Sequence, residues 1–381
     1  MVPRPLVIMG ISEALDALPV TLLTGPRQCG KTTIAREICG TRGGTYYYLE
    51  DPETPLQPES AKLVLKEKTG LVVIDEVQRQ PSLFPLLRVL ADRPHNKARF
   101  LLLGSASLAL VRGASETLAG RIAYVEMGGF SLFEVGVAAQ DDLWTRGGFP
   151  RSTLAETDAL SLLWRKQFVQ SFLERDIPQL GIRVPAIALR RFWTMVAHLH
   201  GQIWNAALLA RSLGTKEDTA RHYLDIVTGA FMVRQLPPWF ENTRKRLVKA
   251  PKVYVRDTGV LHALLGLGDK AALQAHPKLG FSWEGFAIEQ ILSLSCGQSA
   301  AYFYKTHGGT ELDLLLVRGK DRIGFEFKYE DSPRTQKAMH VVLEDLRLDK
   351  LWVVTPGEER HPLTSHIEVI PLAQCLRELA T

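Results

Sequence analysis

Short apolar runs alternate with helical stretches over residues 1–135 of the chain. Each run is nearly continuous in apolar and aromatic residues, which is typical of strands buried on both faces of a parallel sheet. The segments between the runs, such as Lys31–Cys39 and Ser82–Ala91, favour helices. This alternation predicts a doubly wound α/β domain. The expected strands are Val20–Thr24, Tyr46–Glu50, Leu71–Asp75, Phe100–Leu103 and Ile122–Glu126.

Residues 141–275 change to a mainly helical pattern, and a second set of strands follows it. The helices expected in this middle region are Leu160–Leu173, Ala186–Leu199 and Ala206–Leu213. Further along, we expect helices at Trp283–Leu294 and Pro333–Leu346, and strands at Ala301–Lys305, Glu311–Val317, Ile323–Lys328 and Leu351–Thr355. We therefore divide the chain into residues 1–140, 141–200, 201–260 and 261–381.

The composition is that of an ordinary globular protein. Of the 381 residues, 46% are hydrophobic and 23% are charged, which excludes a disordered, collagen-like or disulfide-dense chain. The longest nearly apolar run, residues 101–111, is far shorter than the roughly 20 residues of a membrane helix, and no signal peptide is evident. We therefore expect a cytoplasmic protein that binds no membrane. The four cysteines fit neither a zinc site nor a disulfide framework, and the net charge of +5 allows an acidic partner without requiring one.

The strongest chemical signal is the segment GPRQCGKT at residues 25–32, which fits the phosphate-binding pattern G-x-x-x-x-G-K-[ST]. It follows an expected strand and precedes an expected helix. Glycines let successive N–H groups point toward phosphate oxygens, and the helix N-terminus adds its positive dipole end. We expect Lys31 to reach the β- and γ-phosphates of ATP and Thr32 to hold Mg²⁺. The residues expected to bind the nucleotide are Gly25, Pro26, Arg27, Gln28, Cys29, Gly30, Lys31, Thr32, Thr33 and Asp75.

Two acidic residues end the expected strand Leu71–Asp75 and extend this picture. A strand-end aspartate orders the Mg²⁺ shell in phosphate-loop enzymes, so we expect Asp75 to share the metal with Thr32. The adjacent Glu76 is well placed to polarise water for attack on the γ-phosphate. Without the phosphate loop, two solvated acids at a strand end would have the same pattern.

Two further positions fit the chemistry of an ATPase. Ser105 follows an expected strand and is a candidate to hydrogen-bond the attacking water or the γ-phosphate, although a plain Gly-Ser turn has the same sequence. Arg121 precedes the next strand, where an arginine can reach the γ-phosphate of a neighbouring subunit. A surface arginine is the alternative. The expected catalytic residues are therefore Lys31, Glu76, Ser105 and Arg121.

The order of these features resembles the AAA+ ATPases. The phrases IDEVQ (74–78), LGS (103–105), LAGR (118–121) and RGGFP (146–150) are similar to one prokaryotic branch, whose members join an AAA+ domain to a C-terminal domain of poorly defined function. The resemblance spans nearly the whole chain. It implies Mg²⁺-dependent ATP hydrolysis within a homo-oligomer, with a hexameric ring as one form. The lid arginine of other AAA+ proteins has no unambiguous counterpart here.

The middle of the chain looks like a winged helix-turn-helix, because a helix, a turn at Gly214, a second helix and a strand follow one another. Lys216 and Arg221 fall on or near the second helix, where a recognition helix presents side chains to DNA. A protein-docking module is the alternative. The next segment, residues 244–256, holds six basic residues and no acid, so we expect it to contact DNA phosphates unless it is a solvated hairpin. Its candidate DNA contacts are Arg244, Lys245, Arg246, Lys249 and Lys252.

Within and after that basic segment, the strings KAPKVY (249–254) and DTG (257–259) also resemble the same prokaryotic branch. No secure chemical role follows from the resemblance. Asp257 is as well explained as a turn or cap residue as it is as a ligand.

Three acids and a lysine stand out near the C-terminus. Glu284 lies on an expected helix, Asp313 on an expected strand, and Glu326 and Lys328 share one face of the next strand. Metal-dependent phosphodiester cleavage uses such a set, with Asp313 and Glu326 holding the metal ion. The element order resembles the restriction-endonuclease-like PD-(D/E)xK superfamily, and the four residues would match its acidic and E-x-K positions. An alternation of charges on an edge strand is the alternative, and such folds also persist for binding alone.

Together these patterns predict an α/β protein: a P-loop AAA+ doubly wound parallel sheet, then a helical and winged-helix region, then an α/β restriction-endonuclease-like domain. We expect ATP binding and hydrolysis to be coupled to DNA binding or remodelling, such as translocation, branch migration or ATP-gated processing. One alternative is a regulatory or signalling protein that ATP switches and whose C-terminal domain binds a protein partner. Another is a metal-dependent nuclease that ATP regulates.

Overall fold

The structure, a computed structural model, describes residues 2–94, 97–105, 114, 116–240, 247–294, 300–330 and 332–380. The chain divides into two compact units. Unit 1 comprises residues 1–129 with 229–231, and unit 2 comprises residues 130–228 with 232–381. All three of the regions expected after residue 140 therefore fall almost entirely within unit 2.

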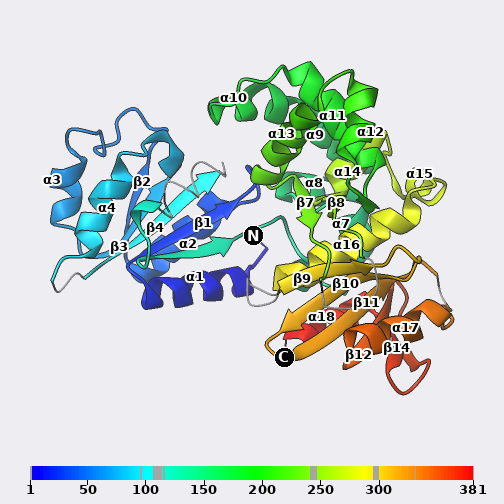
Figure 1. The fold of residues 1–381 in the computed structure, drawn as a ribbon. Coiled ribbons are helices and arrows are strands. Elements are labelled where there is room, and N and C mark those ends of the chain that lie inside the picture. The colour runs from blue at the N-terminus through cyan, green and yellow to red at the C-terminus, as the bar shows by residue number, and fades with distance from the viewer. Residues whose placement is uncertain are drawn as a thin grey trace. The chain divides into compact units, whose positions relative to one another are not determined.

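Unit 1 is built on a five-stranded sheet in the order β2-β3-β4-β1-β5, and every neighbouring pair is parallel (Figure 1). This confirms the α/β class expected from the apolar runs. The first strand of the chain, β1, lies between β4 and β5 in the sheet. Parallel neighbours require the chain to cross over the sheet between strands, and helices form these crossovers. The strands are β1 (Val20–Gly25), β2 (Thr45–Tyr48), β3 (Gly70–Asp75), β4 (Ala98–Ser105) and β5 (Ile122–Glu126).

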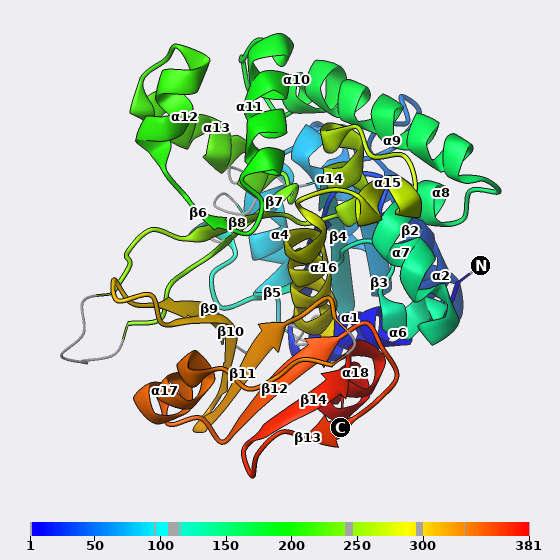
Figure 2. The ribbon, with the colours of Figure 1, turned by 90° about the vertical axis from the view of Figure 1, so that its right-hand side faces the viewer.

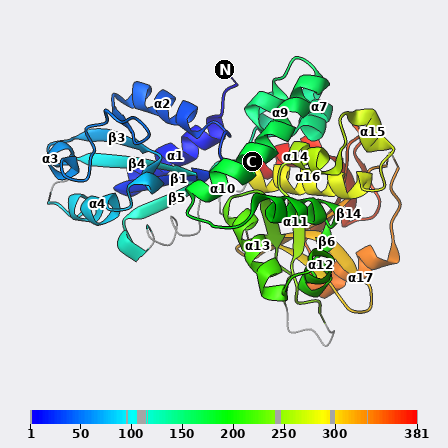
Figure 3. The same ribbon diagram turned by 90° about the horizontal axis from the view of Figure 1, so that it is seen from above.

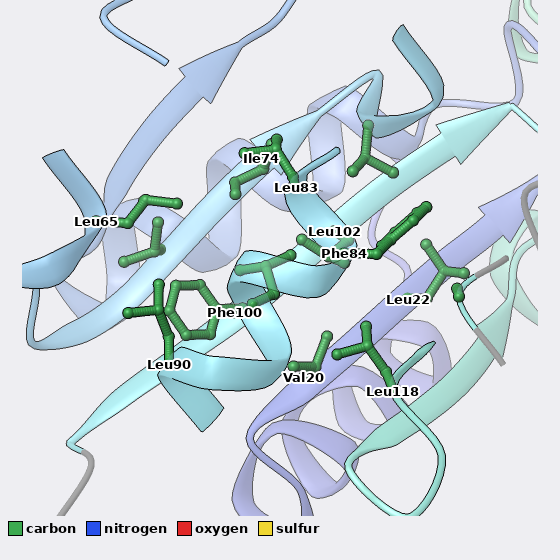
Figure 4. Close-up of a cluster of buried hydrophobic side chains, with 14 of the residues drawn as sticks. Val20, Leu22, Leu65, Ile74, Leu83, Phe84, Leu90, Phe100, Leu102 and Leu118 are labelled. Atoms are coloured by element: carbon green, nitrogen blue, oxygen red, sulfur yellow. The ribbon is translucent and has the colours of Figure 1, made fainter. Parts of the chain in front are cut away.

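Helices cover both faces of this sheet, and α4 and α2 lie on opposite sides of it (Figure 3). On the α4 side, Leu83, Phe84 and Leu90 pack against Phe100 and Leu102 of β4 in one buried cluster (Figure 4). Burying these side chains supplies the main stabilising term of the unit. The helices of unit 1 are α1 (Pro5–Ala17), α2 (Lys31–Arg42), α3 (Ala61–Lys66) and α4 (Leu83–Ala91), with a short 3₁₀ turn η1 (Val77–Arg79).

Unit 2 begins with a mainly helical region, as the periodicity predicts. Local signals set several helix ends: Asn205 accepts a hydrogen bond from the N–H of Leu208 and starts α12, while Gly214, with φ of 68°, ends it. The elements are α6 (Leu132–Val135), η2 (Val137–Ala139), α7 (Gln140–Arg146), α8 (Pro150–Thr153), α9 (Asp158–Ser171), η3 (Phe172–Asp176), α10 (Ile177–Gln179), α11 (Ala186–His198), α12 (Ala206–Leu213), α13 (Glu217–Gly229), α14 (Thr258–Leu265) and α15 (Lys270–Gln274).

A small antiparallel sheet accompanies α11, α12 and α13 (Figure 2). Its strands are β6 (Gln202–Ile203), β7 (Val233–Leu236) and β8 (Lys252–Val255), in the order β6-β8-β7. The connection between β7 and β8 also pairs with β9 near each of its ends. The backbone N–H of Trp239 donates to the carbonyl of Phe303, and that of Val248 donates to the carbonyl of Lys305.

The last part of unit 2 is a six-stranded mixed sheet in the order β13-β14-β12-β11-β10-β9. Strands β9, β10 and β11 form an antiparallel meander, and β11, β12 and β14 run parallel. Helix α17 packs on one face around Met339 and Val342, while α16 packs against β11 and α18. The elements are α16 (Leu279–Leu294), β9 (Ala300–Lys305), β10 (Glu311–Arg318), β11 (Asp321–Phe327), α17 (Lys337–Leu346), β12 (Lys350–Thr355), β13 (His361–Pro362), β14 (Ile367–Pro371) and α18 (Leu372–Ala380).

The longest helix of the described residues is α16, and neither it nor any other helix among them has the length and apolarity to cross a membrane.

Candidate functional site

The loop after β1 has a backbone shape that its glycines permit. Gly25 has φ of 150° and Gly30 has φ of 102°, and Gln28 between them also has a positive φ of 65°. A Cβ atom at Gly25 would lie 2.0 Å from the carbonyl oxygen of Met127. Glycine is therefore required at the first position of the loop for steric as well as conformational reasons.

Lys31 and Thr32 lie at the start of α2, directly after the loop. Lys31 is 8% exposed, and its ammonium donates hydrogen bonds to the carbonyls of Gly25 at 2.8 Å and Pro26 at 2.7 Å. The hydroxyl of Thr32 donates to Oδ2 of Asp75 at 2.8 Å. The loop therefore places an ammonium, a hydroxyl and a carboxylate beside the N-terminus of a helix, where anions bind.

Asp75 comes to the loop because β3 and β1 are parallel strands of one sheet and both end at its carboxyl edge. Its side chain is buried and accepts a second hydrogen bond, from the hydroxyl of Tyr46 at 2.5 Å. Burial, together with Asp75, raises the pKa of Tyr46, so the phenol stays a donor. The hydroxyl and carboxylate oxygens of Thr32 and Asp75 are the hard donors that Mg²⁺ prefers, so these two residues fit the expected metal.

Glu76 adopts a left-handed backbone conformation with φ of 59°, which turns the chain sharply after β3. Its carboxylate hydrogen-bonds the amide of Gln78 and lies 4.0 Å from the guanidinium of Arg27 in the phosphate loop. The same guanidinium lies 3.5 Å from Glu50. Non-glycine residues with positive φ are uncommon, so the backbone at Glu76 is strained; its role in polarising water stays a prediction.

The remaining loop residues have mixed environments. The thiol of Cys29 is buried against the carbonyl of Met127, and Thr33 is exposed. Arg4, which sequence reasoning missed, is 4% exposed and donates to the carbonyl of Cys29 at 3.3 Å. A single arginine before a helix carries no pattern that could have revealed this role, and the same is true of Tyr46.

The other two candidate catalytic residues lie at opposite edges of the sheet. The backbone of Ser105 pairs in register with that of Gly25, so Ser105 lies at the edge that holds the phosphate loop. Its side chain lies outside the described residues. Arg121 precedes β5, at the amino edge, and its guanidinium binds the carboxylate of Asp92 at 2.5 Å and the carbonyl of Ala119 at 2.7 Å. Arg121 is therefore about six residues of strand away from the loop of its own chain, on the order of 20 Å.

The C-terminal acids come together in unit 2. Leu314 pairs with Phe325 across β10 and β11, and one further step of this antiparallel register places Asp313 opposite Glu326. Oδ2 of Asp313 accepts from the N–H of Phe327 at 3.2 Å, and Lys328 lies 3.6 Å from Glu326. Asp313 also lies where the pairing of β10 with β9 shifts register, and such bulges redirect side chains.

Three residues that sequence reasoning did not assign to this cluster complete it: Lys252, Tyr254 and Glu311. The ammonium of Lys252 on β8 lies 3.1 Å from Oε1 of Glu284, 3.2 Å from Oδ1 of Asp313 and 2.8 Å from Oε1 of Glu311. The hydroxyl of Tyr254 donates to the same Oε1 of Glu284 at 2.5 Å. Spacing by two on β8 puts both side chains on one face, which the string KVY could have indicated.

We define the acid cluster as Glu284, Glu311, Asp313 and Glu326, and burial is the main influence on the pKa of two of its members. Burial and the charge of Asp313 raise the pKa of Glu284 to about 7 and raise that of Glu326 as well. Burial also acts to lower the pKa of Lys252, but the surrounding carboxylates raise it further, so the ammonium stays charged.

No group of three or more His, Cys, Asp or Glu side chains is arranged to hold a metal ion within the part of the chain that the structure describes. The expectation that Asp313 and Glu326 bind a metal therefore stays a prediction.

The expected DNA contacts are placed unevenly. Lys216, Arg221 and Lys249 are exposed, but the guanidinium of Arg221 is paired with Glu217 at 3.0 Å and Asp218 at 3.3 Å. Lys252 is 3% exposed, so its expected place on a DNA-binding surface is wrong: the carboxylates of Glu284, Glu311 and Asp313 hold it instead. The other three candidates, Arg244, Lys245 and Arg246, lie outside the described residues.

Asp257 is a helix cap. Its carboxylate accepts from the N–H of Val260 at 2.8 Å, which starts α14, and from the N–H of Gly148 at 2.7 Å. A Cβ atom at Gly147 would lie 2.2 Å from Oδ1 of Asp257, and one at Gly259 would lie 2.0 Å from the carbonyl of Arg146. The strings RGGFP and DTG are therefore two halves of one packed joint.

Comparison with known proteins agrees with the fold and the phosphate loop. Residues 18–136 match the family described as AAA domain, so unit 1 is an AAA-type P-loop ATPase domain. Residues 138–271 and 279–375 match two families described as domains of unknown function, DUF8612 and DUF4143.

The whole chain has close relatives. It is 47% identical over 366 residues to the uncharacterized protein Rv2008c of Mycobacterium tuberculosis and to Mb2031c of Mycobacterium bovis, covering 96% of this chain and 83% of each relative. The chain belongs to the same family as these proteins. Its fold is similar to that of the Walker-type ATPase Paby2304 of Pyrococcus abyssi, with a TM-score of 0.51 and 15% identity over 70% of this chain and 96% of that one.

Proposed function

We propose that this protein is an Mg²⁺-dependent ATPase that couples ATP binding and hydrolysis to the binding or remodelling of DNA by unit 2. The hydrogen bond between Thr32 and Asp75 carries the first half of the proposal. It joins the two residues that would hold Mg²⁺, next to a lysine positioned for the phosphates. Bound Mg²⁺ would neutralise charge on the phosphates, and Glu76 would orient the attacking water.

The DNA half rests on the acid cluster. A helix, three meandering strands, a helix and a parallel strand bring Glu284, Asp313, Glu326 and Lys328 near one another, which supports the proposal of a restriction-endonuclease-like domain. The order of α11, β6, α12, α13, β7 and β8 likewise supports a winged helix before it. Both architectures are common in proteins that handle DNA, so the support is at the level of fold.

Fluorescence anisotropy of labelled duplex and branched DNA tests this half of the proposal. We expect binding that weakens steeply between about 50 and about 200 mM salt, because phosphate contacts release counterions. Lys216→Gln with Lys249→Gln should reduce both the affinity and the salt slope, whereas the exposed control Lys62→Gln in unit 1 should change neither. Absence of DNA binding at the lower salt, with and without an ATP analogue, would contradict the proposal.

One observation favours a regulatory protein instead. The candidate recognition helix α13 presents Glu217, Asp218 and Asp225, and two of these acids neutralise Arg221. Such a face repels phosphates and suits a basic protein surface. In that case ATP would switch the affinity for a protein partner, and DNA would fail to bind in the anisotropy experiment.

A further inference from the structure

Lys252 is the least exposed of the lysines that contact the acid cluster, and it forms ion pairs with three of the four acids. Its ammonium has three N–H donors, and three carboxylate oxygens lie within 3.2 Å of it. Those oxygens come from Glu284 on α16 and from Glu311 and Asp313 on β10. The ammonium therefore lies where the carboxylates of two elements converge.

The other lysines that contact the acid cluster each pair with a single acid. Lys305 binds Glu311, and Lys328 lies 3.6 Å from Glu326. Within the described residues, Lys252 is the one cation in ion-pair distance of both Glu284 and Asp313. The buried carboxylate of Glu284 and the partly buried carboxylate of Asp313 therefore share a single ammonium for neutralisation, and an unpaired charge away from water is costly.

We infer that the acid cluster is a cation site whose resident cation is the ammonium of Lys252, and that a divalent ion binds to Glu284 and Asp313 only when this lysine is withdrawn or replaced. The two cations would need the same oxygens, and their like charges repel strongly in a buried site. The carboxylate oxygens lie 2.8 to 3.2 Å from the ammonium nitrogen of Lys252, whereas oxygen ligands of Mg²⁺ lie about 2.0 to 2.1 Å from the metal. This inference concerns cation binding alone and holds whether or not unit 2 acts on DNA.

The backbone explains how a lysine from an earlier region comes to occupy this place. Lys252 is the first residue of β8, the central strand of the small sheet, and its backbone pairs with Ile203 and Leu236. Two residues on, Tyr254 donates to the same oxygen of Glu284. Both side chains are thus delivered by one strand, and movement of β8 would withdraw them together.

Binding of Mn²⁺ to the full-length chain without nucleotide tests the inference, with free Mn²⁺ measured by electron paramagnetic resonance. Lys252→Met is expected to gain one site that binds at least about tenfold more tightly than any site of the wild type in unit 2. Adding Asp313→Asn to that variant should remove the new site. Lys305→Met is the matched control, because it removes a neighbouring ammonium that contacts Glu311 alone, and it should create no site.

Two results would overturn the inference. One is a wild-type chain that already binds Mn²⁺ in a way that Asp313→Asn abolishes. The other is a folded Lys252→Met chain that gains no site. If Lys252→Met does not fold, Lys252→Met with Glu311→Gln removes one charge of each sign and keeps Glu284 and Asp313, so the same gain is expected. Should that variant also unfold, the comparison of wild type with Asp313→Asn decides.

Discussion

The hydroxyl of Thr32 and the carboxylate of Asp75 meet at 2.8 Å although the two residues are far apart in the chain. One belongs to the helix after β1 and the other ends β3, and the parallel sheet brings both to the same edge. Their contact defines where the phosphates and Mg²⁺ would lie, with Lys31 beside them. The consequences can be tested residue by residue.

Lys31→Ala is expected to reduce ATP turnover at least about a hundredfold, because it removes the ammonium that we expect to contact the phosphates. Phosphate release and binding of a fluorescent ATP analogue measure the two effects separately. Lys62→Ala, an exposed lysine on α3, is the matched control and should behave as wild type. An unchanged ATPase rate in Lys31→Ala would remove the assignment of the site.

Arg121→Ala is expected to leave ATP binding intact and to slow turnover by about a thousandfold or more, as for an arginine finger. Arg121 lies at the amino edge of its own sheet, so it can act only on the nucleotide of another subunit. Mixing Arg121→Ala with Glu76→Gln chains should restore activity, since some boundaries then combine an intact Glu76 with an intact Arg121. A mixture no more active than either variant would rule out action between subunits.

Asp257→Ala is expected to lower the free energy of unfolding by about 2 to 3 kcal/mol, because it removes both a helix cap and the acceptor for Gly148. Asp269 is a matched control: it caps α15 through Ala272 but is exposed, so Asp269→Ala should cost about 1 kcal/mol. Urea unfolding followed by tryptophan fluorescence reports on unit 2, since all seven tryptophans lie between residues 144 and 352. Equal losses in the two variants would contradict the joint of RGGFP and DTG.

The contribution of Glu284 to the stability of unit 2 is expected to fall as the pH rises from 4.5 to about 7, whereas the lowered pKa values of the buried His200 and His262 act in the opposite direction. Burial and Asp313 raise the pKa of Glu284 from 4.5 to about 7, so this carboxyl is protonated to a greater extent in the folded chain than in the unfolded chain in this window. Glu284→Gln cannot lose a proton and should flatten that fall. Urea unfolding at about pH 5 and about pH 7.5 measures the difference.

Glu289 provides a control with the opposite sign. Burial acts to raise its pKa, but Arg234 and Arg256 outweigh burial and lower the pKa to about 2. The contribution of Glu289 to the free energy of unfolding is therefore present above pH 4.5 and lost as the pH falls toward 2. Glu289→Gln should lower stability without altering the slope between pH 4.5 and 7. A Glu284→Gln chain that keeps the wild-type slope would contradict the role of Glu284.

Much of the fold could be predicted because its signals are local. All five strands of unit 1 lie within a few residues of the apolar runs, and the loop at residues 25–32 has its strand and helix in place. Period-two spacing likewise predicted that Glu326 and Lys328 share a face; β11 ends at Phe327, and the ammonium of Lys328 lies 3.6 Å from the carboxylate of Glu326. Strands β13 and β14 and helices α1, α14 and α18 were not predicted, because their patterns are short or are dominated by general apolarity.

The sequence by itself determined which residues have the chemistry for a phosphate loop, a strand-end carboxylate and a cluster of acids, since residue type and short-range spacing are local properties. Only the tertiary structure decided which cation serves those acids. In the sequence, Lys252 is one of six basic residues in a segment without acids, which indicates a solvated surface. Long-range strand pairing instead carries it into a buried site, where the ion pairs with Glu284 and Asp313 offset the cost of losing water.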